Sequence, residues 1–143
     1  MKKLIFVPLI SCCLQSFAQT VTVKEDVINV DDKPYAKIEK AGGGDFTIKD
    51  FANKTLIVIT NKLIIDPSVK SIYNPEGYVG YAQYVFLDSI GQKCETPNNY
   101  VKAEKVAKFI VKNELIKDGA LNEEGVRTFV LVNGTPYSDK NRH

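Results

Sequence analysis

The chain is poor in the residues on which nucleophilic and metal chemistry depend. Its 143 residues include one histidine, three cysteines and no tryptophan. The histidine is His143, in a tail (138–143) that we expect to be flexible, whereas a Ser–His or Cys–His nucleophile needs an imidazole held in place. A zinc site needs several histidine or cysteine ligands. The sequence therefore predicts no catalytic triad, no metal site and no cofactor, and its scattered carboxylates suggest no acid–base pair.

The first 18 residues are a predicted signal peptide. Two lysines precede the apolar run Leu4–Leu14, and small residues follow at Ser16 and Ala18. This order is typical of a secretory leader cleaved between Ala18 and Gln19. The apolar run is too short to span a membrane, and no second run is longer. We therefore expect export to the periplasm or to the outside of the cell, with no membrane span.

The cysteines allow no disulfide bond within the mature chain. Cys12 and Cys13 lie in the leader, which leaves Cys94 alone. Lipid attachment at either leader cysteine is the less favoured alternative, because the residues before them fit a lipid-attachment box poorly. A free cysteine is commonly buried and packs like a small apolar group, and we interpret Cys94 in that way. The alternative is a reactive thiol or an intermolecular disulfide.

The charge gives no sign of a nucleic-acid partner. The chain has 19 basic and 17 acidic residues, and two of the lysines belong to the leader, so basic and acidic residues balance in the mature chain. Affinity for nucleic acid draws on an excess of lysine and arginine. A lysine stripe at positions 102, 105, 108 and 112 is interpreted as the solvated face of a helix.

The first two thirds of the mature chain predict a β-meander. Alternating or β-branched apolar segments bounded by turn residues indicate strands. The expected strands are 20–24, 27–30, 34–40, 45–51, 55–60 with a continuation at 63–65, and 78–87. The pattern leaves open whether Asn61-Lys62 is a bulge or a turn. Gly42-Gly43-Gly44 lacks the Lys-Ser/Thr pair of a phosphate loop, so we interpret it as a linker.

Two helices are predicted after the strands. Thr96–Gly119 begins with a capping threonine and a proline suited to the first helical position, and it ends at a glycine. Leu121–Val132 is the second helix, with Asn122 as its cap. An alternative makes Thr128–Tyr137 a hairpin over Asn133-Gly134. The expected fold is a single α+β domain over 19–137: an antiparallel meander of about five to six strands with two C-terminal helices on one face.

Aromatic residues suggest a surface for a partner. Tyr78, Tyr84 and Phe86 share one face of the last predicted strand. If the helices cover the other face, these rings are open to a protein or a glycan. The alternative is that both faces are buried.

Two short features resemble known exported proteins. Asp88-Ser89-Ile90 resembles the three-residue O-glycosylation motif of Bacteroidetes secreted proteins, and a leader ending in Phe-Ala-Gln is similar to leaders of that group. The layout of a meander followed by helices is similar to small exported proteins of that group with no assigned role. The resemblance implies modification of Ser89 and implies no activity.

Three function classes follow. The first is a non-enzymatic binding or accessory protein that contacts a protein or carbohydrate through Tyr78, Tyr84 and Phe86. The second is an inhibitor of a protease or other hydrolase, with Ser68–Gly77 as its loop. The third, less favoured, is a small hydrolase that uses two carboxylates in a deep pocket.

Overall fold

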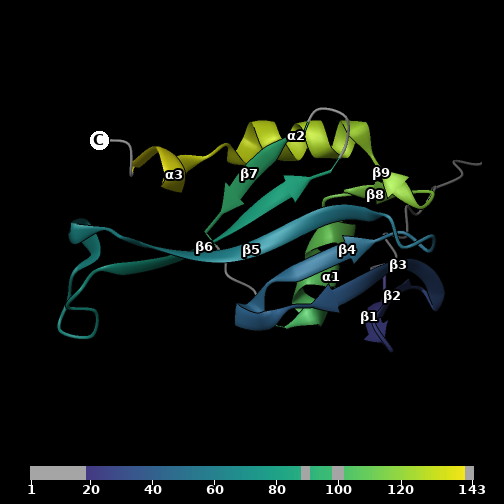
Figure 1. The fold of residues 1–143 in the computed structure, drawn as a ribbon, viewed down its shortest axis with the longest axis horizontal. Coiled ribbons are helices and arrows are strands. Elements are labelled where there is room, and N and C mark those ends of the chain that lie inside the picture. The colour runs from purple at the N-terminus through teal and green to yellow at the C-terminus, as the bar shows by residue number, and fades with distance from the viewer. Residues whose placement is uncertain (1–18, 88–90, 98–101, 141–143) are drawn as a thin grey trace, which may run out of the picture.

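The computed structural model describes residues 19–87, 91–97 and 102–140, and it confirms the α+β class. The predicted leader, Ser89 and His143 lie outside these ranges. In the described part, seven strands form one antiparallel meander in sequence order (Figure 1). They are β1 Val21–Lys24, β2 Val27–Val30, β3 Lys33–Lys40, β4 Phe46–Lys49, β5 Thr55–Ile65, β6 Tyr78–Phe86 and β7 Lys93–Thr96.

The first hairpins close through tight turns of acidic residues. Asp31 and Asp32 between β2 and β3 have φ angles of 50° and 62°, and Glu25 and Asp26 between β1 and β2 have 49° and 60°. Two central residues with positive φ form the turn whose twist matches that of the flanking strands. The predicted turn at Asp31-Asp32 is therefore confirmed.

Strand β5 runs without interruption through the point that the sequence left open. Its pairing with β6 is continuous from Ile57 opposite Phe86 to Ile65 opposite Tyr78. Asn61-Lys62 is thus neither a bulge nor a turn. The glycine linker before β4 forms a short 3₁₀ turn, η1 (Gly42–Gly44).

The first helix is shorter than predicted. Helix α1 spans Ala103–Lys112, and Thr96 is the last residue of β7 rather than a helix cap. Its apolar side chains Val106, Ala107 and Ile110 are buried, on the side away from the exposed lysines. The helix ends near Asn113, whose side-chain Nδ2 donates to the carbonyl of Phe109 at 2.8 Å.

Gly119 belongs to a small ribbon, not to the end of the helix. Strands β8 (Ile116–Lys117) and β9 (Ala120–Leu121) pair across Asp118 and Gly119, whose φ angles are 51° and 77°. The hydroxyl of Tyr35 on β3 donates to the carbonyl of Ile116, which ties this ribbon to the sheet. Burial raises the pKa of Tyr35.

The second helix confirms the helical prediction and excludes the hairpin alternative. Helix α2 spans Glu123–Asn133. Asn122 occupies the predicted capping position, but its side-chain Nδ2 donates 2.8 Å to the carbonyl of Glu114 instead of capping α2. A third, short helix, α3, spans Pro136–Lys140. The tail expected to be flexible from residue 138 onward is therefore helical as far as Lys140.

Helices α1 and α2 both pack on one face of the sheet. The ring of Tyr84 on β6 lies 5.7 Å from that of Phe109 in α1 and 5.4 Å from that of Phe129 in α2. Phe86 also meets Phe129 edge-on at 6.1 Å. This aromatic cluster joins sheet and helices into one core. Among the described helices, none combines the length and apolar character needed to cross a membrane.

Candidate functional site

The distal halves of β5 and β6 project beyond the rest of the sheet. The register of β4 on β5 ends at Phe46 opposite Ile59, and that of β7 on β6 ends at Thr96 opposite Ala82. From there β5 and β6 continue as a two-stranded arm, which we define as residues 62–81, and Figure 1 shows it extending to the left, away from helices α1 and α2. The sequence did not predict this projection.

The tip of the arm is a tight turn held by its own backbone. The N–H of Ser71 donates to the carbonyl of Asn74, and the N–H of Asn74 donates to that of Ser71, both at 3.1 Å. Ile72 and Tyr73 lie between them and are 94% and 98% exposed. The loop thus presents one aliphatic and one aromatic side chain side by side in sequence at its extreme end.

The base of this loop is fixed on both of its strands. The side chain of Asn74 accepts from the N–H of Tyr78 and donates to its carbonyl, each at 3.0 Å. The N–H of Asp66 donates to the carbonyl of Gly77 at 2.8 Å. A Cβ added to Gly77 would lie 2.5 Å from the Asp66 carbonyl, and its φ of 76° also requires glycine. The Ser68–Gly77 loop is therefore a defined element.

Asp66 anchors the start of the loop. Its carboxylate accepts from the hydroxyl and the backbone N–H of Ser68, at 2.6 and 3.0 Å, and from Lys140 Nζ of α3 at 3.0 Å. These bonds, the Ser68 hydroxyl first, lower the pKa of Asp66 to about 2. The ion pair brings α3 to the arm, although 74 residues separate the partners.

Helix α3 packs on the sheet face opposite α1 and α2, where a buried carboxylate binds it. Glu95 on β7 is 1% exposed, and its carboxylate accepts from the N–H groups of Tyr137 and Ser138, at 2.9 and 3.0 Å, and from the Ser138 hydroxyl. Gly134 accepts from the N–H of Glu95 at 2.9 Å. Sequence reasoning missed this contact because it joins residues about forty positions apart.

The three residues of the predicted aromatic contact surface differ in burial. Tyr84 and Phe86 have no exposed area, because α1 and α2 cover the face on which they lie. The expectation that they contact a partner is therefore wrong, and the alternative of burial holds for these two rings. Tyr78 shares their face, but it lies on the arm beyond the helices and is 52% exposed.

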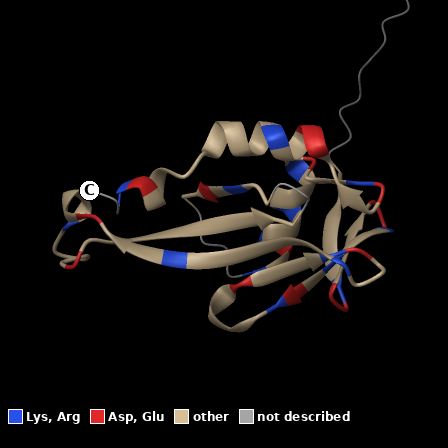
Figure 2. Cartoon of the chain, turned by 45° about the horizontal axis from the view of Figure 1, so that its top comes forward, with Lys and Arg blue, Asp and Glu red and all other residues tan. Residues whose placement is uncertain are grey.

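The exposed apolar residues of the sheet gather on the arm. Together with the tip residues, Leu63 and Ile65 of β5 and Tyr78 of β6 are exposed. Lys62 is the single charged residue in the sequences of β5 and β6. Figure 2 accordingly shows the two long strands that lead to the arm almost entirely in tan. Several exposed apolar side chains gathered on one projection are typical of a site that binds another molecule.

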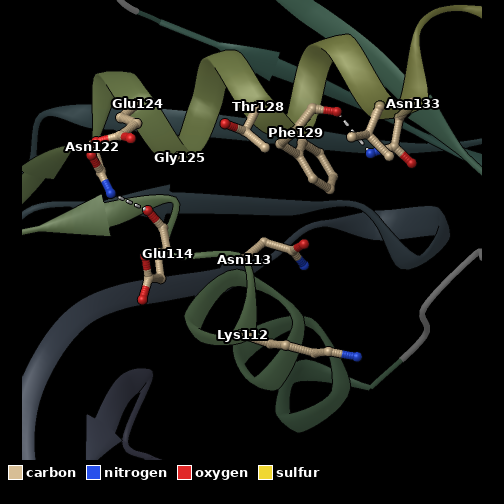
Figure 3. A pocket seen from close by; sticks show the side chains of 10 residues that line it. Lys112, Asn113, Glu114, Asn122, Glu124, Gly125, Thr128, Phe129 and Asn133 are labelled. Carbon is tan, nitrogen blue, oxygen red and sulfur yellow. Dashed lines mark hydrogen bonds between the residues drawn. The ribbon is translucent and has the colours of Figure 1, made fainter.

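A cleft of about 350 Å³ lies between the end of α1 and helix α2 (Figure 3). Gly125 allows α2 to approach closely, since a Cβ there would lie 2.3 Å from the Glu114 carbonyl. The cleft is lined by two carboxylates, Glu114 and Glu124, both exposed, and in Figure 3 the side chain of Glu114 points away from helix α2. A carboxyl that acts as a general acid needs a buried or apolar setting. The cleft therefore gives no support to a two-carboxylate hydrolase.

Cys94 is buried, as interpreted from the sequence. It is fully covered, and burial raises its pKa to about 12, with the neighbouring Glu95 adding to the shift. A thiol held in its protonated form is a poor nucleophile.

Within the described ranges, no three His, Cys, Asp or Glu residues gather in a way that could hold a metal ion. The lysines at 102, 105, 108 and 112 are exposed.

Comparison of the chain with models of known protein families, with curated proteins and with solved structures found no match.

Proposed function

We propose that the chain is an exported, non-enzymatic binding protein that holds a partner protein through the tip of the arm. The observation that carries this proposal is the almost complete exposure of Ile72 and Tyr73 on a turn that hydrogen bonds hold in one shape. When a partner covers such side chains, the removal of apolar area from water stabilises the complex by about 25 cal/mol per Å². Because the turn is already ordered, binding costs little conformational entropy.

The partner fits a protein better than a glycan. An aliphatic and an aromatic side chain together match an apolar pocket on a protein surface, where aromatic anchors contribute most to affinity. Export is supported by the leader-like pattern of the first 18 residues.

The proposal is tested by recovery of a partner from an envelope extract, with the chain from Gln19 as immobilised bait. The Ile72→Ser/Tyr73→Ser variant removes the proposed anchors. A matched control is Leu131→Ser/Val132→Ser, because this pair on α2 is also highly exposed, at 79% and 77%. We expect a partner that binds the wild type and the α2 control and is lost from the tip variant. Equal recovery by all three baits, or loss from the α2 control instead, would refute the role of the tip.

A second candidate is an inhibitor of a hydrolase, in which the tip enters the enzyme's pocket. The specific observation that favours it is the bonding of Ser68–Gly77 at both ends, because an inhibitory loop must resist cleavage while it is bound. Incubation with a panel of proteases and glycosidases tests it. Inhibition with an intact loop supports the inhibitor, whereas cleavage within 68–77 without inhibition contradicts it.

A further inference from the structure

The two strands of the arm differ in how their outer edges are protected. In an antiparallel strand, alternate residues turn their N–H and C=O groups to opposite sides. On β6, the edge groups of Tyr78 are both bonded by the side chain of Asn74. The edge of β5 has no such cover from β4, whose register ends at Ile59.

The backbone groups on the open edge of β5 belong to Leu63 and Ile65. The N–H of Asn61 points away from β6, since it donates to the Asp45 carboxylate at 2.8 Å. The N–H of Asp66 points toward β6, since it donates to Gly77. Leu63 and Ile65 have the parity of Asn61, so their backbone groups face outward. Their side chains are also exposed, at 66% and 57%.

Within the described part of the chain, this open edge is short and has defined limits. The bond between Asn61 and Asp45 closes it at one end, and Pro67, which has no N–H, closes it at the other. Between them lie Lys62, Leu63, Ile64, Ile65 and Asp66. An unpaired strand edge with exposed apolar residues is a template for pairing with another strand.

Two copies of this five-residue segment are complementary when they run antiparallel to each other. In a two-fold pairing centred on Ile64, Leu63 of one copy lies opposite Ile65 of the other, and each such pair exchanges two backbone hydrogen bonds. The same register places Lys62 opposite Asp66. Lys62 Nζ donates to Gln83 Oε1 at 2.7 Å, and an ammonium group has three donors, while the Asp66 carboxylate retains acceptor capacity. A shift of the centre by one residue loses this charge pairing.

We propose that two copies of the chain associate through the β5 edges of their arms, antiparallel and centred on Ile64. The apolar side chains of Leu63, Ile65 and Tyr78 from both copies then lie on one continuous face. The five paired residues do not include Ile72 or Tyr73, so this proposal is independent of the function proposed for the tip. Because the interface is short, we expect a weak dimer.

Self-association is measured by sedimentation over a range from about 10 μM to about 1 mM, where small interfaces dissociate. Leu63→Lys places a charge on the edge, and Leu131→Lys changes another exposed leucine, on α2, as the matched control. We expect the wild type and the control to dimerise, and Leu63→Lys to raise the dissociation constant about tenfold or more, because two symmetric pairs are lost. A wild type that stays monomeric over the whole range would overturn the proposal.

The register is tested by disulfide formation, since Cα atoms about 5.5 Å apart in a hydrogen-bonded pair suit a disulfide. A mixture of Leu63→Cys and Ile65→Cys chains should cross-link much faster than either variant alone. It should also react faster than a mixture of Leu63→Cys with Leu131→Cys. Buried Cys94 contributes little background. Equal rates in all mixtures would show random collision and would contradict the register even if a dimer forms.

Discussion

The ring of Tyr137 in α3 stacks on the ring of Tyr81 in β6, with centroids 4.8 Å apart and planes 13° apart. Tyr81 lies on the sheet face opposite Tyr84, so α3 packs on the face opposite the one that α1 and α2 cover. Together with the bond from Lys140 to Asp66, this contact packs α3 against the base of the arm, on the face opposite α1 and α2. The C-terminal helix therefore links the sheet to the start of the tip loop.

Glu95 is expected to be essential for this attachment. Glu95→Ala leaves the N–H groups of Tyr137 and Ser138 without their acceptor, which should lower the free energy of unfolding by about 3 kcal/mol. Urea denaturation measures the loss. Exposed Glu104→Ala is the control and should change stability by less than about 0.5 kcal/mol. Similar midpoints for the two variants would contradict the role of Glu95.

Gly125 is expected to tolerate no side chain. A Cβ there would meet the Glu114 carbonyl at 2.3 Å, so Gly125→Ala must push α2 away from the turn and should cost about 2 kcal/mol or more. Gly42→Ala is the matched control, because no atom lies within 4 Å of its added Cβ. Thermal unfolding compares the two. A Gly125→Ala protein as stable as Gly42→Ala would disprove the close approach.

Tyr78 and Tyr84, two of the three tyrosines of β6, should differ widely in how much stability their truncation costs. Tyr84→Ala removes a buried ring from between Phe109 and Phe129 and should cost about 3–5 kcal/mol. Tyr78→Ala removes a half-exposed ring from the arm and should cost less than about 1 kcal/mol. Chemical denaturation distinguishes them. A large loss at Tyr78 with little at Tyr84 would reverse the assignment of core and surface.

The pKa of Asp66 reports the anchoring of the tip loop. NMR titration of its carboxyl carbon should give a pKa of about 2. Ser68→Ala should raise this pKa more than Lys140→Ala does, because the Ser68 hydroxyl is the largest cause of the shift. Since the folded pKa is depressed, the stabilisation is present above the unfolded value near 3.8 and is lost as the pH falls toward 2. An unshifted pKa in the wild type would mean that the loop is not anchored.

The sequence predicted the elements whose pattern is local. Six strands and the two long helices follow from local sequence patterns, and the structure confirms each of them. Strand β7 was missed because Lys-Cys-Glu-Thr is short and mostly polar, and because Thr96-Pro97 also suits a helix start. The Asp118-Gly119 turn was interpreted as the end of a helix, since glycine serves both purposes.

The division of the aromatic surface could not be predicted from alternation. Tyr78 and Tyr84 have the same parity, yet their burial differs because the helices cover only part of the length of β6. Whether a residue has an odd or even position in a strand specifies the face on which its side chain lies. It does not specify how far along the strand the helices extend. The loop Ser68–Gly77 was identified from its turn residues, but its projection depends on where β4 and β7 end.

The most direct test of the proposed function is photo-cross-linking from the tip. A photo-activatable phenylalanine analogue replaces Tyr73 in one protein and Leu131 in a control, and each is irradiated in envelope extract. Binding through the tip predicts a discrete covalent adduct from position 73 that is absent from position 131 and is reduced by excess unlabelled wild type. Adducts of the same pattern from both positions, or none that the wild type competes away at position 73, would contradict binding through the tip.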